Sequence, residues 1–296
     1  MDESVVSHFM RLFRGRGDVR WSWATKRPEY GPVLRRHFEA HLCSPDPGDW
    51  IGTYPLLGHM ASWGCVDIDN TDDPTTAFNL QGALRYKEVP AWVERTDHGY
   101  HVWVFPAEPL IAAETMRHAL YAACAAIGYE PKEVNPKQAD ASRLTRGIGN
   151  LVRLPYNGAM AEVLDTRWFI DPTTRSSLGI GCLEMIDNRR APYWALEAIA
   201  KLYTPPPKNV IDMGAVPPLS KQITDGMSGR TFTIYRDGPL PGSDRSGTML
   251  RLAAACANDG LSPAETAAVL KGCWYNKYEG RPDEDDIIDD LIARVS

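Results

Sequence analysis

Two aspartates stand two residues apart at the end of an apolar stretch, WGCVDIDN (residues 63–70). Side chains of a β-strand alternate between its two faces, so Asp67 and Asp69 would project together while the apolar residues beside them face the other way. Adjacent carboxylates repel each other unless a cation neutralises them, and hard divalent ions such as Mg²⁺ prefer carboxylate oxygens. The pair therefore indicates a metal site, although a solvated strand end or an Asx turn is the commoner origin of an isolated D-x-D.

A second polar group occurs in ERTDHGYHVWVF (residues 94–105), where a turn from Thr96 to Gly99 precedes a strand that carries His101. A hydroxyl, a glycine backbone and an imidazole all suit the oxygens of a triphosphate. A single histidine is more often a core or surface residue, and His98 is interpreted in that way. This stretch alone leaves both interpretations open for His101.

An acid and a cluster of cations follow in KEVNPKQADASRLTRGIGNLVRLPYNG (residues 132–158). The acid is Glu133, and the cations are Lys137, Arg143, Arg146 and Arg153. An acid opposite the aspartate pair would complete a two-ion site, and nearby cations would neutralise phosphates. A basic loop followed by a core strand is the simpler interpretation of this stretch taken alone.

A sheet must position these groups, and alternation with β-branched and aromatic content predicts its strands. The predicted strands are residues 61–69, 91–96, 100–106, 132–134 and 150–155. Helical composition predicts helices at residues 75–88 and 116–129. Strands interleaved with helices predict an α/β (α+β) catalytic domain.

The composition changes along the chain and predicts three parts. We expect the catalytic domain at residues 1–203, a connector in the Pro- and Gly-rich residues 204–244, and a small all-α module at residues 245–296. In the last part, Ser262 is a predicted N-cap and Pro263 occupies the first helical position.

The overall composition excludes several classes of protein. With 44% hydrophobic and 24% charged residues, the 296-residue chain has the composition of a soluble globular protein. No apolar run approaches the roughly 20 residues of a membrane span, and the first residues lack the apolar core of a signal peptide, so we expect a cytoplasmic protein without a membrane partner. The net charge of −6 argues against nucleic-acid binding over the whole surface but allows a local basic channel. The six scattered cysteines predict free thiols rather than a zinc site.

Four short motifs follow one another along the chain. They are D-x-D at Asp67 and Asp69, T-x-x-G-Y-H at residues 96–101, E-V-x-P-K-Q at residues 133–138 and G-N-L-V-R-L-P at residues 149–155. Together they resemble the ordered motifs of the archaeo-eukaryotic primase superfamily, in its phage and plasmid primase-polymerase branch. The segments FRGRGD (13–18) and HLCSPDPGDWIGTYPL (41–56) resemble the lead-in of that branch. The second motif usually reads S-G-x-G-x-H, whereas here Thr96 keeps the hydroxyl and Asp97 adds a negative charge.

The resemblance implies an activity, a fold and a set of site residues. The implied reaction is template-directed nucleotidyl transfer from nucleoside triphosphates on single-stranded DNA, in phage or plasmid replication, hence in the host cytoplasm if phage-encoded. Asp67, Asp69 and Glu133 would be catalytic and would hold two Mg²⁺ or Mn²⁺ ions. The implied nucleotide-binding residues are Thr96, His101, Lys137, Asn150 and Arg153. The implied fold is an α/β core around a sheet of RNA-recognition-motif type.

The C-terminal part is similar to the helical module that follows such cores and helps to hold the template. Its candidate phosphate contacts are Arg245, Arg251, Lys271, Lys277 and Arg281, although a solvated helix face explains such residues more often. The chain contains no G-x-x-x-x-G-K-[ST] motif. A separate replicative helicase would therefore supply any unwinding.

Two other functions remain open. A metal-dependent nuclease or phosphotransferase would use the same acids for two-ion hydrolysis, without a triphosphate pocket, and would tolerate substitution of His101. A catalytically silent replication-initiation or DNA-binding protein is the other alternative. The three intact acids argue against it, because buried unpaired acids are costly without a cation.

Overall fold

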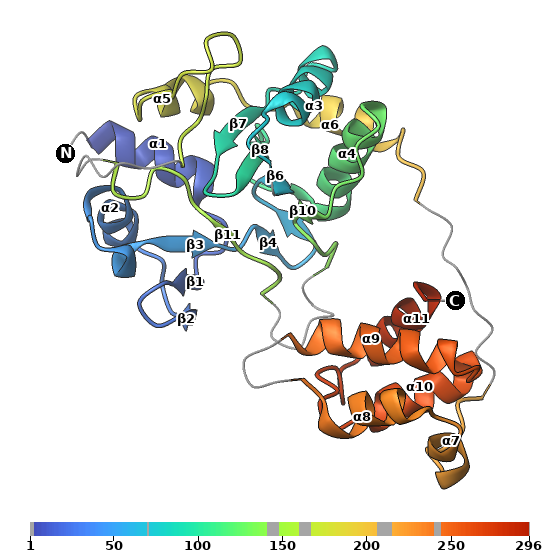
Figure 1. Cartoon of the computed structure of the whole chain (residues 1–296). Coiled ribbons are helices and arrows are strands. Elements are labelled where there is room, and N and C mark those ends of the chain that lie inside the picture. The colour runs from blue at the N-terminus through green and yellow to red at the C-terminus, as the bar shows by residue number, and fades with distance from the viewer. Residues whose placement is uncertain are drawn as a thin grey trace. The chain divides into compact units, whose positions relative to one another are not determined.

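The computed structural model describes residues 3–69, 71–140, 148–159, 167–205, 215–239 and 244–295 (Figure 1). Contacts within the chain divide it into two compact units, the first running to Thr204 and the second from Pro205. Among the described residues, no helix combines the length and apolar character that a membrane span requires.

The first unit is built around a four-stranded antiparallel sheet in the order β10-β6-β8-β7. In chain order its elements are β6 (Gly64–Asp69), α3 (Thr75–Tyr86), β7 (Trp92–Arg95), β8 (Gly99–Val104), α4 (Ala113–Ala126) and β10 (Glu133–Asn135). This β-α-β-β-α-β succession with the fourth strand beside the first is the split βαβ arrangement. The expected fold class, an α/β core around a sheet of RNA-recognition-motif type followed by a helical module, is confirmed.

The two faces of this sheet have different neighbours because successive side chains alternate. Val66, Ile68 and Val102 belong to the apolar core formed with α3 and α4, and Figure 1 shows these helices on one side of the sheet. Cys65 and Trp103 face the opposite way, into a second core formed with α1 (Glu3–Phe13) and α2 (Arg35–Cys43). Asp67 and Asp69 lie on this second face.

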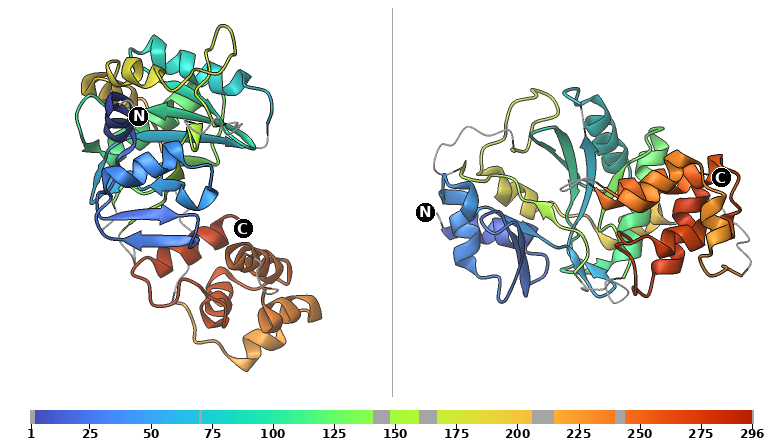
Figure 2. Two further views of the ribbon diagram at one scale, coloured as in Figure 1. Left: turned by 90° about the vertical axis from the view of Figure 1, so that its left-hand side faces the viewer. Right: turned by 60° about the horizontal axis from the view of Figure 1, so that its bottom comes forward.

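Short strands and helices complete the first unit. A second antiparallel sheet has the order β11-β3-β1-β2, with β1 (Val19–Ser22), β2 (Arg27–Tyr30), β3 (Ile51–Thr53) and β11 (Val152–Arg153). A third sheet has the order β4-β5-β9, with β4 (Leu56–Leu57), β5 (Met60–Ala61) and β9 (Ile111–Ala112). The remaining elements are η1 (Pro47–Asp49), α5 (Cys182–Asp187) and α6 (Tyr193–Ala200). The β1–β2 hairpin lies on the side of the unit away from α3 (Figures 1 and 2).

The second unit is all helical. Its helices are α7 (Lys221–Asp225), α8 (Gly229–Asp237), α9 (Arg245–Asn258), α10 (Pro263–Gly272) and α11 (Glu284–Ala293). Ser262 caps α10 as predicted, with Glu265 completing a capping box. The expected connector at 204–244 differs from the structure, because α7 and α8 lie within it and Ile223 and Met227 belong to the core of the helical unit. Serine N-caps start both helices, at Ser220 and Ser228, despite the Pro- and Gly-rich composition around them.

Gly99 allows strands β6 and β8 to approach each other at the end that carries the aspartates. A Cβ atom at this position would lie 2.0 Å from the carbonyl oxygen of Ile68 and 3.2 Å from the Cα atom of Asp69. Backbone atoms cannot move aside as a flexible side chain can. We therefore expect Gly99→Ala to lower the free energy of unfolding by about 1–3 kcal/mol, as overpacking does.

The matched control is Gly82→Ala, in the exposed middle of α3, where a Cβ would contact nothing within 4 Å. Alanine at a helix interior is about 0.5–1 kcal/mol better than glycine. Urea unfolding of the two variants should shift the midpoint in opposite directions. Equal midpoints would show that β8 does not need glycine there.

Candidate active site

The strand register brings the predicted acids and His101 together. In the pairing of β10 with β6, Glu133 lies opposite Asp67, and in the pairing of β6 with β8, His101 lies opposite the same aspartate. Asp69 lies two residues further along β6, on the same face of the sheet. These four side chains line a single pocket of about 240 Å³, together with Thr96 and residues 151–153 at β11.

The electrostatics of this pocket favour a cation. Burial raises the pKa of Asp67, His101 opposes that shift, and the nearby carboxylates of Asp69, Glu133 and Glu94 raise it further. The donors are carboxylate oxygens, which suit Mg²⁺ or Mn²⁺. In the part of the chain that the structure describes, no three His, Cys, Asp or Glu side chains form a preformed metal-binding group. The donor type and its excess negative charge fit a divalent ion, and a bound ion would have to draw these carboxylates together.

A buried carboxylate behind the pocket, Glu94, was not predicted from the sequence. Glu94 is fully buried, and its Oε2 accepts hydrogen bonds from Nδ1 of His101 at 2.9 Å and Nε1 of Trp103 at 2.6 Å. Its Oε1 lies 3.0 Å from a guanidinium nitrogen of Arg167. Burial alone would raise the pKa of Glu94, but Arg167, His101 and Trp103 together hold it below its ordinary value.

The Glu94 contact fixes the orientation of the imidazole. An ionised carboxylate only accepts hydrogen bonds, so Nδ1 of His101 carries a proton. The other ring nitrogen, Nε2, lies 3.6 Å from Oδ1 of Asp67 in the pocket. Glu94 therefore presents one defined nitrogen of His101 to whatever binds beside the aspartates.

The sequence did contain a signal for Glu94. It is a charged residue inside the apolar strand AWVERT, and it lies directly opposite His101 in the β7–β8 pairing. An acid at an inward position of a buried strand needs a partner. Arg167, which also lines the pocket, had no comparable signal, because it lies beyond the fourth motif.

The turn before β8 is held by its own backbone. The Thr96 amide donates to the carbonyl of Gly99 at 2.9 Å, and the His98 amide donates to Oγ1 of Thr96 at 3.4 Å. His98, interpreted from the sequence as an ordinary core or surface residue, is exposed and lines the pocket. The negative charge of Asp97 is compensated, since its Oδ2 lies 3.0 Å from Nη1 of Arg153 and 4.0 Å from Nη1 of Arg167.

Three further residues predicted to bind the nucleotide, Arg153, Lys137 and Asn150, divide into two groups. Arg153 lines the pocket, and its guanidinium carbon lies 4.9 Å from the ring centre of Trp50 and 5.6 Å from that of Trp23. Lys137 and Asn150 do not line it. Nζ of Lys137 lies 3.5 Å from Oε2 of Glu133, and Oδ1 of Asn150 accepts from Nε2 of Gln138 at 3.1 Å. Nucleotide binding by these two residues stays a prediction, as it does for Arg153, Thr96 and His101.

Comparison with known families decides the classification. Residues 26–179, more than half of the chain, match the archaeo-eukaryotic primase domain of TOTE conflict systems. The chain belongs to the archaeo-eukaryotic primase family. The matched stretch contains all three acids, His101 and Arg167, so the pocket described above lies inside the archaeo-eukaryotic primase domain.

Two further comparisons say less about this archaeo-eukaryotic primase than the family match does. A crystal structure of the primase RepB' is similar to the chain at 12% identity and a TM-score of 0.32, covering 98% of this chain and 94% of that one. The search of curated proteins gave no match. The superfamily expected from the motifs is confirmed, and a primase-type function follows from it. The family description names conflict systems, so a role in phage or plasmid replication stays a prediction.

Several cations of the helical unit already have acidic partners. Lys271 lies 2.6 Å from Asp285, and Arg281 lies 2.7 Å from Asp283. Side chains engaged in this way are less available to phosphates than unpaired ones. The role of the C-terminal cations in nucleic-acid binding therefore stays a prediction. The six cysteines form no disulfide with one another, and the expectation that they bind no zinc stays a prediction as well.

Proposed function

We propose that the protein is a template-dependent DNA primase-polymerase that starts and extends chains by two-metal nucleotidyl transfer. The observation that carries the proposal is the register of three strands, which places Asp67, Asp69 and Glu133 in one pocket with His101. In this reaction, the 3′-hydroxyl of a primer or initiating nucleotide attacks the α-phosphate of an incoming nucleotide, and pyrophosphate leaves.

Each side chain has a role that follows from its place. Asp67, Asp69 and Glu133 would hold the ions, on the face of the sheet opposite to α3 and α4. Bound Mg²⁺ or Mn²⁺ would lower the pKa of the attacking hydroxyl and stabilise the leaving pyrophosphate. His101, oriented by Glu94, and the hydroxyl of Thr96 would contact the triphosphate.

Two arginines supply positive charge to the same pocket. Arg153 and Arg167 both line it, and their shared partner Asp97 is partly exposed. A guanidinium fork matches the oxygens of a phosphate, so a triphosphate can replace the Asp97 carboxylate as the partner of Arg153.

The test is a synthesis assay that also recognises the nuclease alternative. The full chain is incubated with 5′-labelled single-stranded DNA, Mg²⁺ or Mn²⁺ and one labelled nucleoside triphosphate at a time, without primer. The proposal predicts short new products and intact template. Shortened template without new products would identify a nuclease, and neither change would indicate a silent DNA-binding protein.

The wider setting is part of the same proposal. Single-stranded DNA and nucleoside triphosphates are the substrates, and a separate replicative helicase supplies unwinding because the chain has no G-x-x-x-x-G-K-[ST] motif. We place the reaction in the cytoplasm, or in that of a bacterial host if the chain is phage-encoded.

Asp97 competes with phosphate for Arg153, which makes the effect of its removal predictable. Asp97→Asn should lower the KM for nucleotide roughly two- to fivefold, the range expected for one partly exposed charge. Steady-state kinetics at fixed template concentration measure it. Asp18→Asn, which removes the same charge from an ion pair with Arg16 outside the pocket, is the control. A raised KM for Asp97→Asn would mean that Asp97 positions Arg153 instead of competing for it.

A further inference from the structure

A second cavity in the first unit is lined by arginines and has no residue in common with the carboxylate pocket. Its volume is about 870 Å³, within the range of small-molecule sites. Helix α1, the following loop, α2, the end of α5 and the turn after it contribute its charged residues. These are Arg11, Arg14, Arg35, Arg190 and Asp187.

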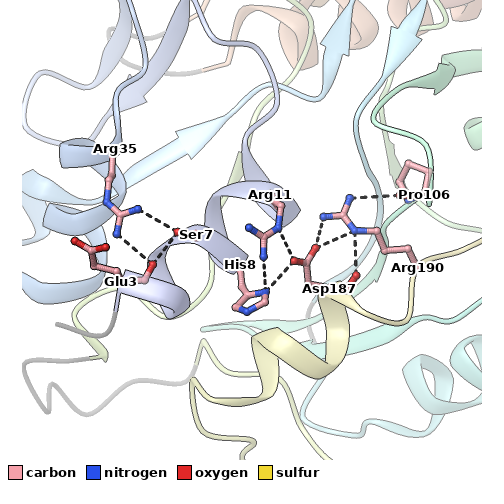
Figure 3. Close-up of polar contacts among 8 residues, drawn as sticks. All are labelled: Glu3, Ser7, His8, Arg11, Arg35, Pro106, Asp187 and Arg190. Atoms are coloured by element: carbon pink, nitrogen blue, oxygen red, sulfur yellow. Dashed lines mark hydrogen bonds and ion pairs between the residues drawn. The ribbon is translucent and has the colours of Figure 1, made fainter.

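A buried carboxylate holds two of these arginines in place. Figure 3 shows Asp187 between Arg11 and Arg190, and its side chain is only 6% exposed. Oδ2 accepts from Nε of Arg11 at 2.6 Å and contacts Nδ1 of His8 at 2.8 Å, while Oδ1 accepts from Nε of Arg190 at 3.0 Å. Arg190 also reaches the carbonyl of Pro106. One carboxylate therefore orders two guanidiniums without neutralising both.

The other two arginines differ in how they are held. Arg35 donates from Nη1 to Oγ of Ser7 at 3.1 Å and from Nη2 to the carbonyl of Glu3 at 3.2 Å, as Figure 3 shows. Its Nε pairs with Glu39 at 2.8 Å. Arg14 is exposed and has no ion pair or hydrogen bond within the described ranges of the chain.

The charge balance of this cavity favours an anionic ligand, because Asp187 and the Glu39 partner of Arg35 offset only part of the charge of its four guanidiniums. Four guanidiniums and a single carboxylate line it, in a chain whose net charge is −6. Arginine forks match phosphate oxygens, and a preorganised fork loses little entropy when it binds. Met10, Leu57 and Leu110 also line the cavity and offer apolar surface to a ring. A nucleotide combines these two features.

We propose that this arginine cavity is a second binding site for nucleotide phosphate, separate from the carboxylate pocket. The phosphate belongs either to a free nucleotide or to the backbone of a single-stranded nucleic acid. Because the two sites share no residue, the proposal goes beyond the proposed catalysis and does not depend on it. Guanidiniums bind phosphate without a metal, so this site works in the presence of a chelator.

The experiment measures binding by the full chain in EDTA, with a short fluorescent oligo(dT) in one arm and fluorescent ATP in the other. Arg14→Ala and Arg35→Ala should each weaken binding about tenfold, since a hydrogen bond to a charged group contributes about that factor. Arg36→Ala is the matched control, because it removes the same charge from the neighbouring exposed position of α2, outside the cavity. The exposed Arg14 has no partner to lose in the described structure, so its variant keeps the test valid if Arg35→Ala destabilises the fold.

Each outcome has one meaning. Weaker ATP binding in the cavity variants assigns the site to free nucleotides, and weaker oligo(dT) binding with ATP binding absent or unchanged assigns it to a strand backbone. Binding equal to that of Arg36→Ala in both arms overturns the proposal. The synthesis assay described under the proposed function tests catalysis in the presence of metal ions, so a failure of the catalytic proposal is recognised separately from a failure here.

Discussion

Asp67→Asn and Asp69→Asn are each expected to lower nucleotide incorporation by about 10³-fold or more, because each removes a ligand from an ion that supplies several kcal/mol of transition-state stabilisation. The fold should survive both changes. Burial and neighbouring acids raise the pKa of Asp67, so its ionised form is unfavourable in the metal-free protein. Without metal, Asp67→Asn should therefore unfold at the same temperature as the wild type or at a higher one.

Thermal unfolding with EDTA and with Mn²⁺ separates the two effects. Mn²⁺ should raise the unfolding temperature of the wild type by mass action and should have little effect on either variant. Asp72→Asn is the control, since Asp72 is exposed and lies outside the pocket. Incorporation near the wild-type rate by either pocket variant would end the two-ion hypothesis.

The second large effect is expected for Glu94→Gln. This change keeps the shape of the side chain but leaves the Arg167 guanidinium, itself 4% exposed, without its buried counter-charge. Removing one member of a buried ion pair costs about 3–5 kcal/mol. His101 loses the acceptor that fixes its proton, so incorporation should fall as well.

Urea unfolding measures this cost, with Glu197→Gln as the control. Glu197 forms an exposed pair with Lys201 at 3.3 Å, which is worth less than about 1 kcal/mol. A double variant, Glu94→Gln with Arg167→Gln, should recover part of the loss because no buried charge is then left unpaired. If Glu94→Gln and Glu197→Gln unfold alike, the buried network does not stabilise the pocket.

The same residue predicts a pH dependence of stability. The pKa of Glu94 is lower in the folded protein than its ordinary value of 4.5. The stability that its charge contributes is therefore complete above that ordinary value and is lost as the pH falls through the lower folded-state value. The difference between wild type and Glu94→Gln should accordingly be large at neutral pH and shrink in acid.

The sequence indicated the aspartate pair of the pocket because its two members lie two residues apart in the chain. A D-x-D at a strand end places both carboxylates on one face, whatever the tertiary structure does. Glu133 lies opposite Asp67 because of the strand register, which spacing in the sequence does not fix. The order of the motifs is what predicted Glu133 as the third acid. Glu94 and Arg167 were missed because their partnership joins residues far apart in the chain.

Composition was a weaker guide than capping and burial in the second unit. Prolines and glycines around residues 204–244 predicted a connector, yet α7 and α8 form there, each after a serine N-cap. Ile223 of α7 is buried in the core of the helical unit. The N-cap at Ser262 was predicted from the sequence, and the structure adds Glu265 as the second member of a capping box.

Template-directed transfer is the central claim, and the most direct measurement is the dependence of incorporation on template sequence. The full chain with Mn²⁺ is given α-phosphate-labelled guanine nucleotide on oligo(dC) or oligo(dA), without primer. The wild type should form labelled chains on oligo(dC) and none on oligo(dA). The Asp67→Asn protein should form none on either template. Equal labelling on the two templates, or release of labelled monophosphate without chains, would contradict the account.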